Sequence, residues 1–207
     1  MKKYELTAEF IEKWGKKLFR IKALISFGSV EAGKLGGYVE KEDNLAQDGD
    51  AWVYGDAWVC GNARVYGNAR VCGNARVYGN ARVYGNARVY GDAEVYGNAR
   101  VCDDARVCGN AEVCGNAEVC GNADYLLIGR IGSRFSFTTF FKNKDKGITV
   151  SCGCFLGTIA EFRAKVTDTH GNNKHAKMYN LAADMAELQI LGEEHFDKLN
   201  TNKSEPF

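Results

Sequence analysis

Side chains that commonly carry catalysis are scarce in this sequence. Its three histidines are His170, His175 and His195, all late in the chain. His170, in TDTHGNN, could act as a general base, but a cation at a helix end is also favourable by about 0.3 to 1 kcal/mol. A serine elbow, a metal-binding helix motif and a paired-carboxylate pattern do not occur in the sequence. We therefore predict no catalytic residue, with His170 as the alternative.

Two cysteines form a close pair that could hold a metal or act as nucleophiles. Cys152 and Cys154, in SCGCF, are separated by one residue, which is too tight for the usual zinc pair, and no second pair completes four ligands. Either thiol could pair with His170 or His175, but no orienting acid stands at a recognisable spacing. The pattern favours a structural thiol pair, with a metal site as the alternative, and no cofactor is predicted.

The other cysteines all occupy one position of an internal repeat that is otherwise tyrosine. They are Cys60, Cys72, Cys102, Cys108, Cys114 and Cys120. Their shared position indicates that they fill repeat sites rather than form a disulfide framework.

Arginine recurs at one position of a six-residue repeat that runs from Gly49 to Ala123. The rule is G-[N/D]-A-x-V-[Y/C], with alanine at every sixth residue from Ala51. In an extended A-x-V segment, alanine and valine point inward and x, often arginine, points outward. The G-[N/D] pair tolerates the bend between short straight sides.

Short extended segments, each followed by a bend, must close into coils. The strands of one coil then pair with the strands of the coils above and below it. Three hexads per coil and twelve hexads predict about four coils. The predicted fold is mainly β, a single-stranded parallel β-helix spanning residues 49–124. A glycine every sixth residue excludes an α-helix, because each costs about 1 kcal/mol there.

This pattern resembles the hexapeptide-repeat proteins that form a left-handed parallel β-helix, which also place a small residue two before an aliphatic one. The chain departs from that pattern by placing Tyr54, Cys60 or Tyr66 directly after valine, which leaves the handedness open. The flanking segments resemble those of phage and prophage β-solenoid proteins. The resemblance implies that an enzyme of this class would be a trimeric acyl-CoA-dependent acyltransferase with a histidine base, but the repeat contains no histidine.

Stacking at 18 residues predicts three outward columns and a stack of Tyr66 on Tyr84. The columns are Arg64, Arg82, Arg100 and Glu118; Arg70, Arg88, Arg106 and Asp124; and Trp58, Arg76, Glu94 and Glu112. Such ladders can be a solvated exterior whose long arginine stems cover the β wall. They can also support self-association, because residues 51–90 hold five arginines and one acid whereas 91–124 hold two arginines and seven acids. A third interpretation is binding of an anion or nucleic acid, with guanidinium groups on phosphates and tyrosines beside bases.

Residues 1–48 predict a cap for the open end of the solenoid. KKYEL and KKLFRIKAL read as strands around a turn at Gly15, although TAEFIEKW could form a short helix. KLGGYVEKEDNL then predicts an irregular first coil, and its Gly36–Gly37 pair lacks the context of a phosphate loop.

Residues 125–207 predict an α+β module with strands in DYLLIGRIG, FSFTTFFK and GITVSCGCF. Thr158 and Glu161 form a capping box for a first helix that ends at Gly171. A second helix ends near Gly192, and a loose tail, NTNKSEPF, follows. The predicted apolar stripe of that second helix is Met178, Leu181, Met185 and Leu188.

Composition indicates a soluble chain, with a net charge of +1 and no long apolar run. We predict a cytoplasmic location, in the host cell if the protein is phage-encoded, and no membrane partner. The predicted function is a non-enzymatic phage-type interaction protein that binds a protein, itself or an anionic partner, as an inhibitor of a host defence system would. The alternative is an acyltransferase.

Overall fold

The protein is described by a computed structural model covering residues 1–201, with side chains described as far as Asp197. The chain divides into two compact units, Met1–Asn122 and Ala123–Phe207, and we describe each by itself. Among the described residues, no helix has the length and apolar character needed to cross a lipid bilayer.

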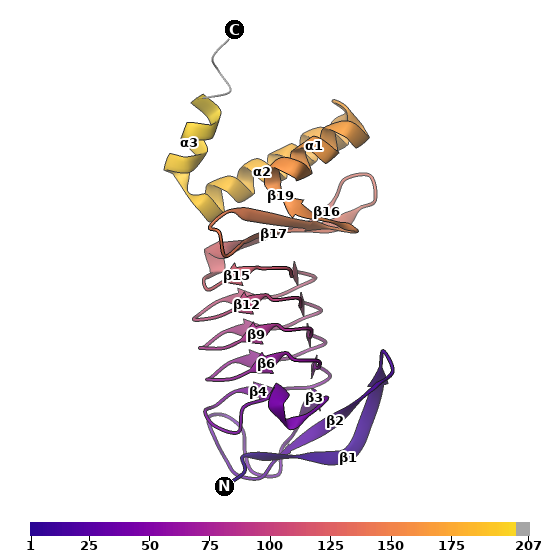
Figure 1. Cartoon of the computed structure of the whole chain (residues 1–207), viewed down its shortest axis with the longest axis vertical. Helices are drawn as coiled ribbons and strands as arrows, with labels where there is room; N and C mark the ends of the chain where they lie inside the picture. Colours follow the sequence, from indigo (N-terminus) through magenta and orange to yellow (C-terminus); the bar gives the residue numbers. More distant parts are fainter. Residues whose placement is uncertain (202–207) are drawn as a thin grey trace. The chain divides into compact units, whose positions relative to one another are not determined.

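The first unit contains a parallel β-solenoid of about five turns, which confirms the predicted fold class (Figure 1). Three parallel stacks run along it, and strands 18 residues apart pair in register, as in Arg64↔Arg82 and Val65↔Val83. Each repeat contributes a two-residue strand: β4 (Trp52–Val53), β5 (Trp58–Val59), β6 (Arg64–Val65), β7 (Arg70–Val71), β8 (Arg76–Val77), β9 (Arg82–Val83), β10 (Arg88–Val89), β11 (Glu94–Val95), β12 (Arg100–Val101), β13 (Arg106–Val107), β14 (Glu112–Val113) and β15 (Glu118–Val119).

The solenoid has one turn more than the twelve hexads alone predict. Strand β3 (Leu35–Val39) pairs in parallel with β5, and Leu45, after the 3-10 helix η1 (Glu42–Asn44), bridges to Val65. Gly36 makes this irregular turn possible, since a Cβ there would lie 2.6 Å from the carbonyl oxygen of Val53. The Gly36–Gly37 pair therefore serves close packing of the backbone.

Alanine and valine fill the interior as the repeat predicts. Every repeat alanine from Ala51 to Ala117 and every valine from Val53 to Val119 is at most 1% exposed. The corners are glycines in the left-handed region, such as Gly79 with φ of 71°. Asp103 takes the glycine position at one corner and keeps that conformation, with φ of 52°.

Most corners stack so closely that a side chain there would be crowded as well as strained by the backbone angle. A Cβ on Gly79 would meet the backbone nitrogen of Gly97 at 3.0 Å, whereas a Cβ on Gly33, which has φ of 85°, would meet nothing within 4 Å.

We expect Gly79→Ala to lower the free energy of unfolding by about 1 to 3 kcal/mol more than Gly33→Ala. Both variants place alanine at positive φ, so their difference isolates the close approach between coils. Urea denaturation followed by circular dichroism measures it. Equal losses in the two variants would show that the corner spacing imposes no constraint.

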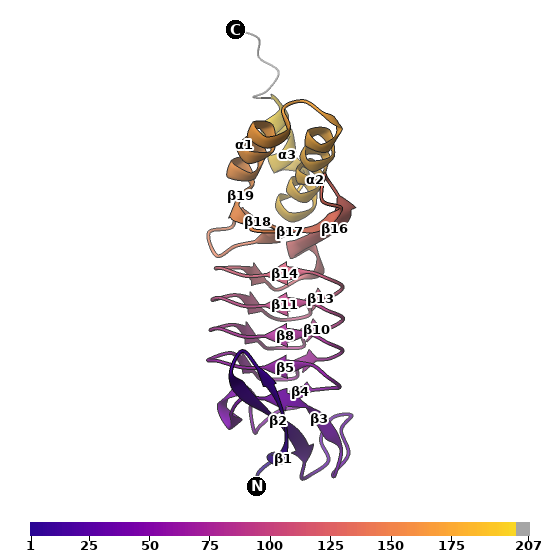
Figure 2. The same ribbon diagram turned by 90° about the vertical axis from the view of Figure 1, so that its right-hand side faces the viewer.

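The N-terminal segment forms the predicted β-rich cap, and the helix alternative for TAEFIEKW is wrong. Strands β1 (Tyr4–Lys13) and β2 (Lys16–Ala23) form an antiparallel hairpin whose turn holds Trp14 and Gly15 at positive φ. The exposed Trp14 ring packs edge-on against Trp58 and Tyr78, each at 4.9 Å. The hairpin thus lies along the solenoid face that carries β5 and β8 (Figure 2).

Two polar side chains satisfy backbone carbonyls at the start of the solenoid. The buried ammonium of Lys3 donates to the carbonyls of Asp48, Gly49 and Ala51 at 3.0 to 3.3 Å. Burial lowers the pKa of Lys3 to about 8, and the nearby Asp48 and Asp50 carboxylates oppose that shift. Asn44 donates in the same way to the carbonyls of Gly61 and Ala63.

Replacing Lys3 with methionine should lower the free energy of unfolding by about 1 to 3 kcal/mol, because buried carbonyls lose their donor. Lys2→Met is the matched control, since the Lys2 ammonium makes an exposed ion pair with Glu42. It should change stability by less than about 1 kcal/mol. A thermal melt in which both variants match the parent protein would contradict the capping role of Lys3.

The second unit combines a four-stranded antiparallel sheet with helices. The sheet order is β16 (Tyr125–Ile131), β17 (Ser136–Lys142), β18 (Ile148–Cys152) and β19 (Phe155–Thr158), after the short helix η2 (Asn122–Asp124). Helix α1 (Ile159–His170) begins at the predicted Thr158–Glu161 capping box and ends at Gly171. Helix α2 (Lys174–Leu191) ends at Gly192 as predicted.

The predicted apolar stripe of α2 is wrong. Met178, Leu181, Met185 and Leu188 are 40% to 63% exposed. The buried face instead carries Ala176, Tyr179, Ala182, Ala183, Ala186, Glu187 and Ile190. Its alanines bring α2 close to the core around Phe140 and Phe162, so small residues mark the buried side.

Two further predictions for this unit need correction. A third helix, α3 (Glu193–Thr201), follows Gly192, whereas two helices are predicted, and it includes the first two residues of the predicted tail NTNKSEPF. Residues 202–207 of that tail lie outside the described part of the chain. Asp124 does not extend a solenoid column, because β13 ends its sheet. It belongs to η2 and pairs with Lys142 at 3.2 Å.

Candidate anion-binding face of the solenoid

Arg64, Arg82 and Arg100 form one column on strands β6, β9 and β12, and Glu118 on β15 follows them. The alternation of A-x-V places all three arginine side chains outside the wall, where they are exposed. Coil stacking sets their spacing at about 4.8 Å per step.

The three arginines lack carboxylate partners. Among the described residues, no acidic oxygen lies within 4.0 Å of the guanidinium groups of Arg64, Arg82 or Arg100. Arg76, on another face, contrasts with them because it pairs with Glu94 at 2.7 Å. At this spacing two neighbouring arginines repel each other by about 0.9 kcal/mol in water. The column is therefore unfavourable on its own, and a bound anion would stabilise it.

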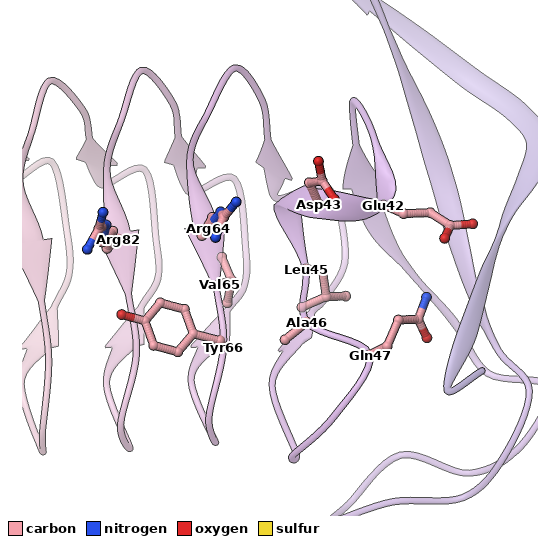
Figure 3. A pocket seen from close by; sticks show the side chains of 9 residues that line it. All are labelled: Glu42, Asp43, Leu45, Ala46, Gln47, Arg64, Val65, Tyr66 and Arg82. Atoms are coloured by element: carbon pink, nitrogen blue, oxygen red, sulfur yellow. The ribbon is translucent and has the colours of Figure 1, made fainter. Parts of the chain in front are cut away.

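Two open grooves border this column. The first, of about 460 Å³, is lined by Glu42, Asp43, Leu45, Ala46, Gln47, Arg64, Val65, Tyr66 and Arg82 (Figure 3). The second, of about 580 Å³, is lined by Asn62, Arg64, Asn80, Arg82, Asn98, Arg100 and Asn116. Arg64 and Arg82 line both grooves.

The first groove exists where the tyrosine position of the repeat is occupied by alanine. The backbone amide of Ala46 donates to the carbonyl of Val65, which places Ala46 beside Tyr66 in the adjoining coil. On its other side, Tyr66 stacks on Tyr84 with centroids 5.0 Å apart and planes 2° from parallel. A small side chain at position 46 therefore leaves one side of the Tyr66 ring facing a hollow.

Tyr66 lies in the field of the arginine column. Burial and the neighbouring Tyr84 raise the pKa of Tyr66, and the guanidinium groups of Arg82, Arg100 and Arg64 oppose this rise. The Tyr66 ring and the guanidinium groups of Arg64 and Arg82 therefore lie on the same groove, whose lining does not include Tyr84.

A ladder of asparagines lines the second groove. Asn62, Asn80, Asn98 and Asn116 each stand one coil apart, and each Nδ2 donates to the Oδ1 of the next at 3.1 to 3.4 Å. One N–H of each amide serves the ladder, and the second remains to meet a ligand or water. The turn preference of asparagine did not indicate this ladder, but the 18-residue register could have.

The remaining predicted arginines lie on the other two faces. Arg70, Arg88 and Arg106 stack in one column with Trp52. Arg76 is held by Glu94, which also accepts from the Tyr78 hydroxyl at 2.8 Å. Burial and this hydrogen bond raise the pKa of Tyr78, so this third face forms a closed polar network.

The side chains considered for catalysis do not assemble into a nucleophile–base pair. His170 lies in the last turn of α1 and stacks against Tyr179 with centroids 5.8 Å apart. In residues 1–197, no hydrogen bond joins Cys152 or Cys154 to His170 or His175. The Cys152 sulfur accepts instead from the Thr138 hydroxyl at 3.2 Å, and Cys154 is exposed.

Two cysteines interpreted as repeat fillers are bonded to each other. Cys102 and Cys120 stand 18 residues apart in one column and form a disulfide. The carboxylate of Asp103 lies within 4.8 Å of both sulfurs, but the disulfide leaves neither sulfur as a thiolate that could ligate a metal. The period of 18 could have indicated this pair. Within the described part of the chain, Cys152 and Cys154 do not join a group of converging metal-ligating atoms.

Comparison with known proteins identifies the repeat. Three overlapping segments, residues 57–73, 69–83 and 81–97, match the YdcK beta solenoid repeat. Residues 57–97 of the solenoid are therefore similar to YdcK-type repeats. These segments contain Arg64 and Arg82, so the first part of the arginine column stands on the matched repeats. A search of curated protein sequences finds no match to the chain.

Because the arginine column is unpaired, Arg82→Gln should raise the free energy of unfolding by up to about 1 kcal/mol at low salt. The gain should shrink in 1 M NaCl, where the screening length is about 3 Å. Arg76→Gln, which removes an ion pair, should give no gain. Urea denaturation is the suitable measurement, since urea does not screen charge; a loss of stability in Arg82→Gln would contradict unfavourable repulsion in the column.

Proposed function

We propose that this protein is a non-enzymatic binding scaffold whose solenoid presents Arg64, Arg82 and Arg100 to a phosphate-containing anion. The observation that carries the proposal is the unpaired arginine column between two grooves. Such a column opposes folding slightly and has no partner within the described solenoid, so an external anion is the group that would compensate it.

The asparagine ladder and the stacked tyrosines support the same function. Guanidinium and amide N–H groups are the donors that phosphate oxygens accept from, and they alternate across the second groove. The rigid coil spacing holds these donors in place without a ligand, which lowers the ordering cost of binding.

The wider setting of this function stays a prediction. A phage or prophage origin, inhibition of a host defence system and self-association were predicted from sequence resemblance and charge distribution. Binding of an anion through the solenoid is compatible with each, and it is the part of the proposal that the geometry supports.

The test is the binding of inorganic tripolyphosphate, measured by isothermal titration calorimetry at low and moderate salt. We expect Arg82→Gln to weaken binding at least about tenfold, because a charge-assisted contact is lost. Arg76→Gln is the matched control and should stay within about twofold, since Arg76 is held by Glu94.

A separate variant, Arg88→Gln, addresses the second arginine column. Binding that depends on Arg88 and not on Arg82 would move the site to the face of β7 and β10. Absence of any arginine-dependent binding of tripolyphosphate would reject the proposed function.

A further inference from the structure

The arginine column is limited in length by acidic groups at both ends. Asp43 lines the first groove next to Arg64, and Glu42, whose carboxylate pairs with Lys2 at 2.7 Å, lies farther along its rim (Figure 3). At the other end, Glu118 takes the position that follows Arg100. The positive stretch is therefore three arginines long, or about 10 Å over two coil steps.

This length favours a short anion over a polymer. A stretch of about 10 Å accommodates about two or three phosphate groups. A longer nucleic acid strand that continued along the column would bring its phosphates against Glu118 or against Asp43, where like charges repel.

The first groove supplies a place for an aromatic group next to the same arginines. Ala46 leaves a hollow beside the Tyr66 ring, and stacking on tyrosine suits any nucleobase. The exposed carboxylate of Asp43 on the rim can accept hydrogen bonds from the exocyclic amino group of a base. The carboxylate at this end of the groove therefore repels phosphate groups and can accept hydrogen bonds from a nucleobase.

We propose that this face is one site for a nucleotide with two or three phosphate groups, whose base lies against Tyr66 and whose phosphates contact Arg64, Arg82 and Arg100. This inference rests on the proposed function and adds the ligand class and its orientation. The base occupies the acidic end beside Ala46, and the phosphates extend along the column and the asparagine ladder.

The first test compares adenosine triphosphate with inorganic tripolyphosphate by calorimetry. In the parent protein the nucleotide should bind about fivefold to a hundredfold more tightly, because stacking adds to the phosphate contacts. Ala46→Tyr restores the repeat residue and fills the hollow, so it should abolish this advantage and leave tripolyphosphate affinity unchanged. Ala46→Ser is the matched control, which keeps the hollow open and should retain the advantage.

A second variant protects the test against misfolding of Ala46→Tyr. Tyr66→Leu removes the ring without filling the hollow and should also abolish the nucleotide advantage. Suppose that tripolyphosphate binds through Arg82. The nucleotide site is then rejected if the nucleotide binds no more tightly than tripolyphosphate in the parent protein, or if it keeps its advantage in both variants. In either case the anion-binding function stands. If neither anion binds through Arg82, the proposed function itself fails.

The acidic ends are tested with a 20-nucleotide single-stranded DNA. In the parent protein this strand should bind more weakly than adenosine triphosphate. The double variant Asp43→Asn, Glu118→Gln should strengthen its binding at least about fivefold, as two repulsive groups are removed. A strand that already binds more tightly than the nucleotide in the parent protein would reject the short-ligand site.

Discussion

Backbone hydrogen bonding between successive coils is the constraint on which the rest of the solenoid depends. Arg82 N donates to Ala99 O at 2.9 Å, and Asn80 N donates to Gly97 O at 2.8 Å, so each residue is held above the residue 18 positions away. A coil can sit this close to the next only if its interior is narrow and its corners lack side-chain bulk. Alanine, valine and glycine at fixed positions meet both conditions.

The same constraint has a chemical consequence on the outside. Residues at each outward position of the repeat stack at about 4.8 Å along a face, so like side chains are often brought into contact range whether or not this is favourable. Asparagines and tyrosines gain from it through an amide ladder and ring stacking. Arginines do not, and the unpaired column of Arg64, Arg82 and Arg100 is one place where the repeat departs from what stability alone would select.

Irregularity, rather than repetition, gives the candidate site its limits. Ala46 belongs to the irregular turn before the hexads and creates the hollow beside Tyr66. Asp43 and Glu118 bound the positive stretch at its two ends. A perfectly regular solenoid would present an unlimited ladder, whereas these few departures define a site of finite length with two different ends.

The sequence by itself determined the solenoid, its period of 18 residues and most members of each outward column, because a strict six-residue repeat with glycine at nearly every corner favours stacking of three hexads per coil. It also indicated the N-terminal hairpin and the capping box at Thr158, which depend on neighbouring residues alone. Tertiary structure decided which arginines remain unpaired, since Arg76 meets a carboxylate one coil away and Arg82 does not. It likewise decided the hollow at Ala46 and the buried face of α2, where alanines rather than Met178 or Leu181 face the core. These features depend on which surfaces meet in space, and a pattern of residue types along one segment does not contain that information.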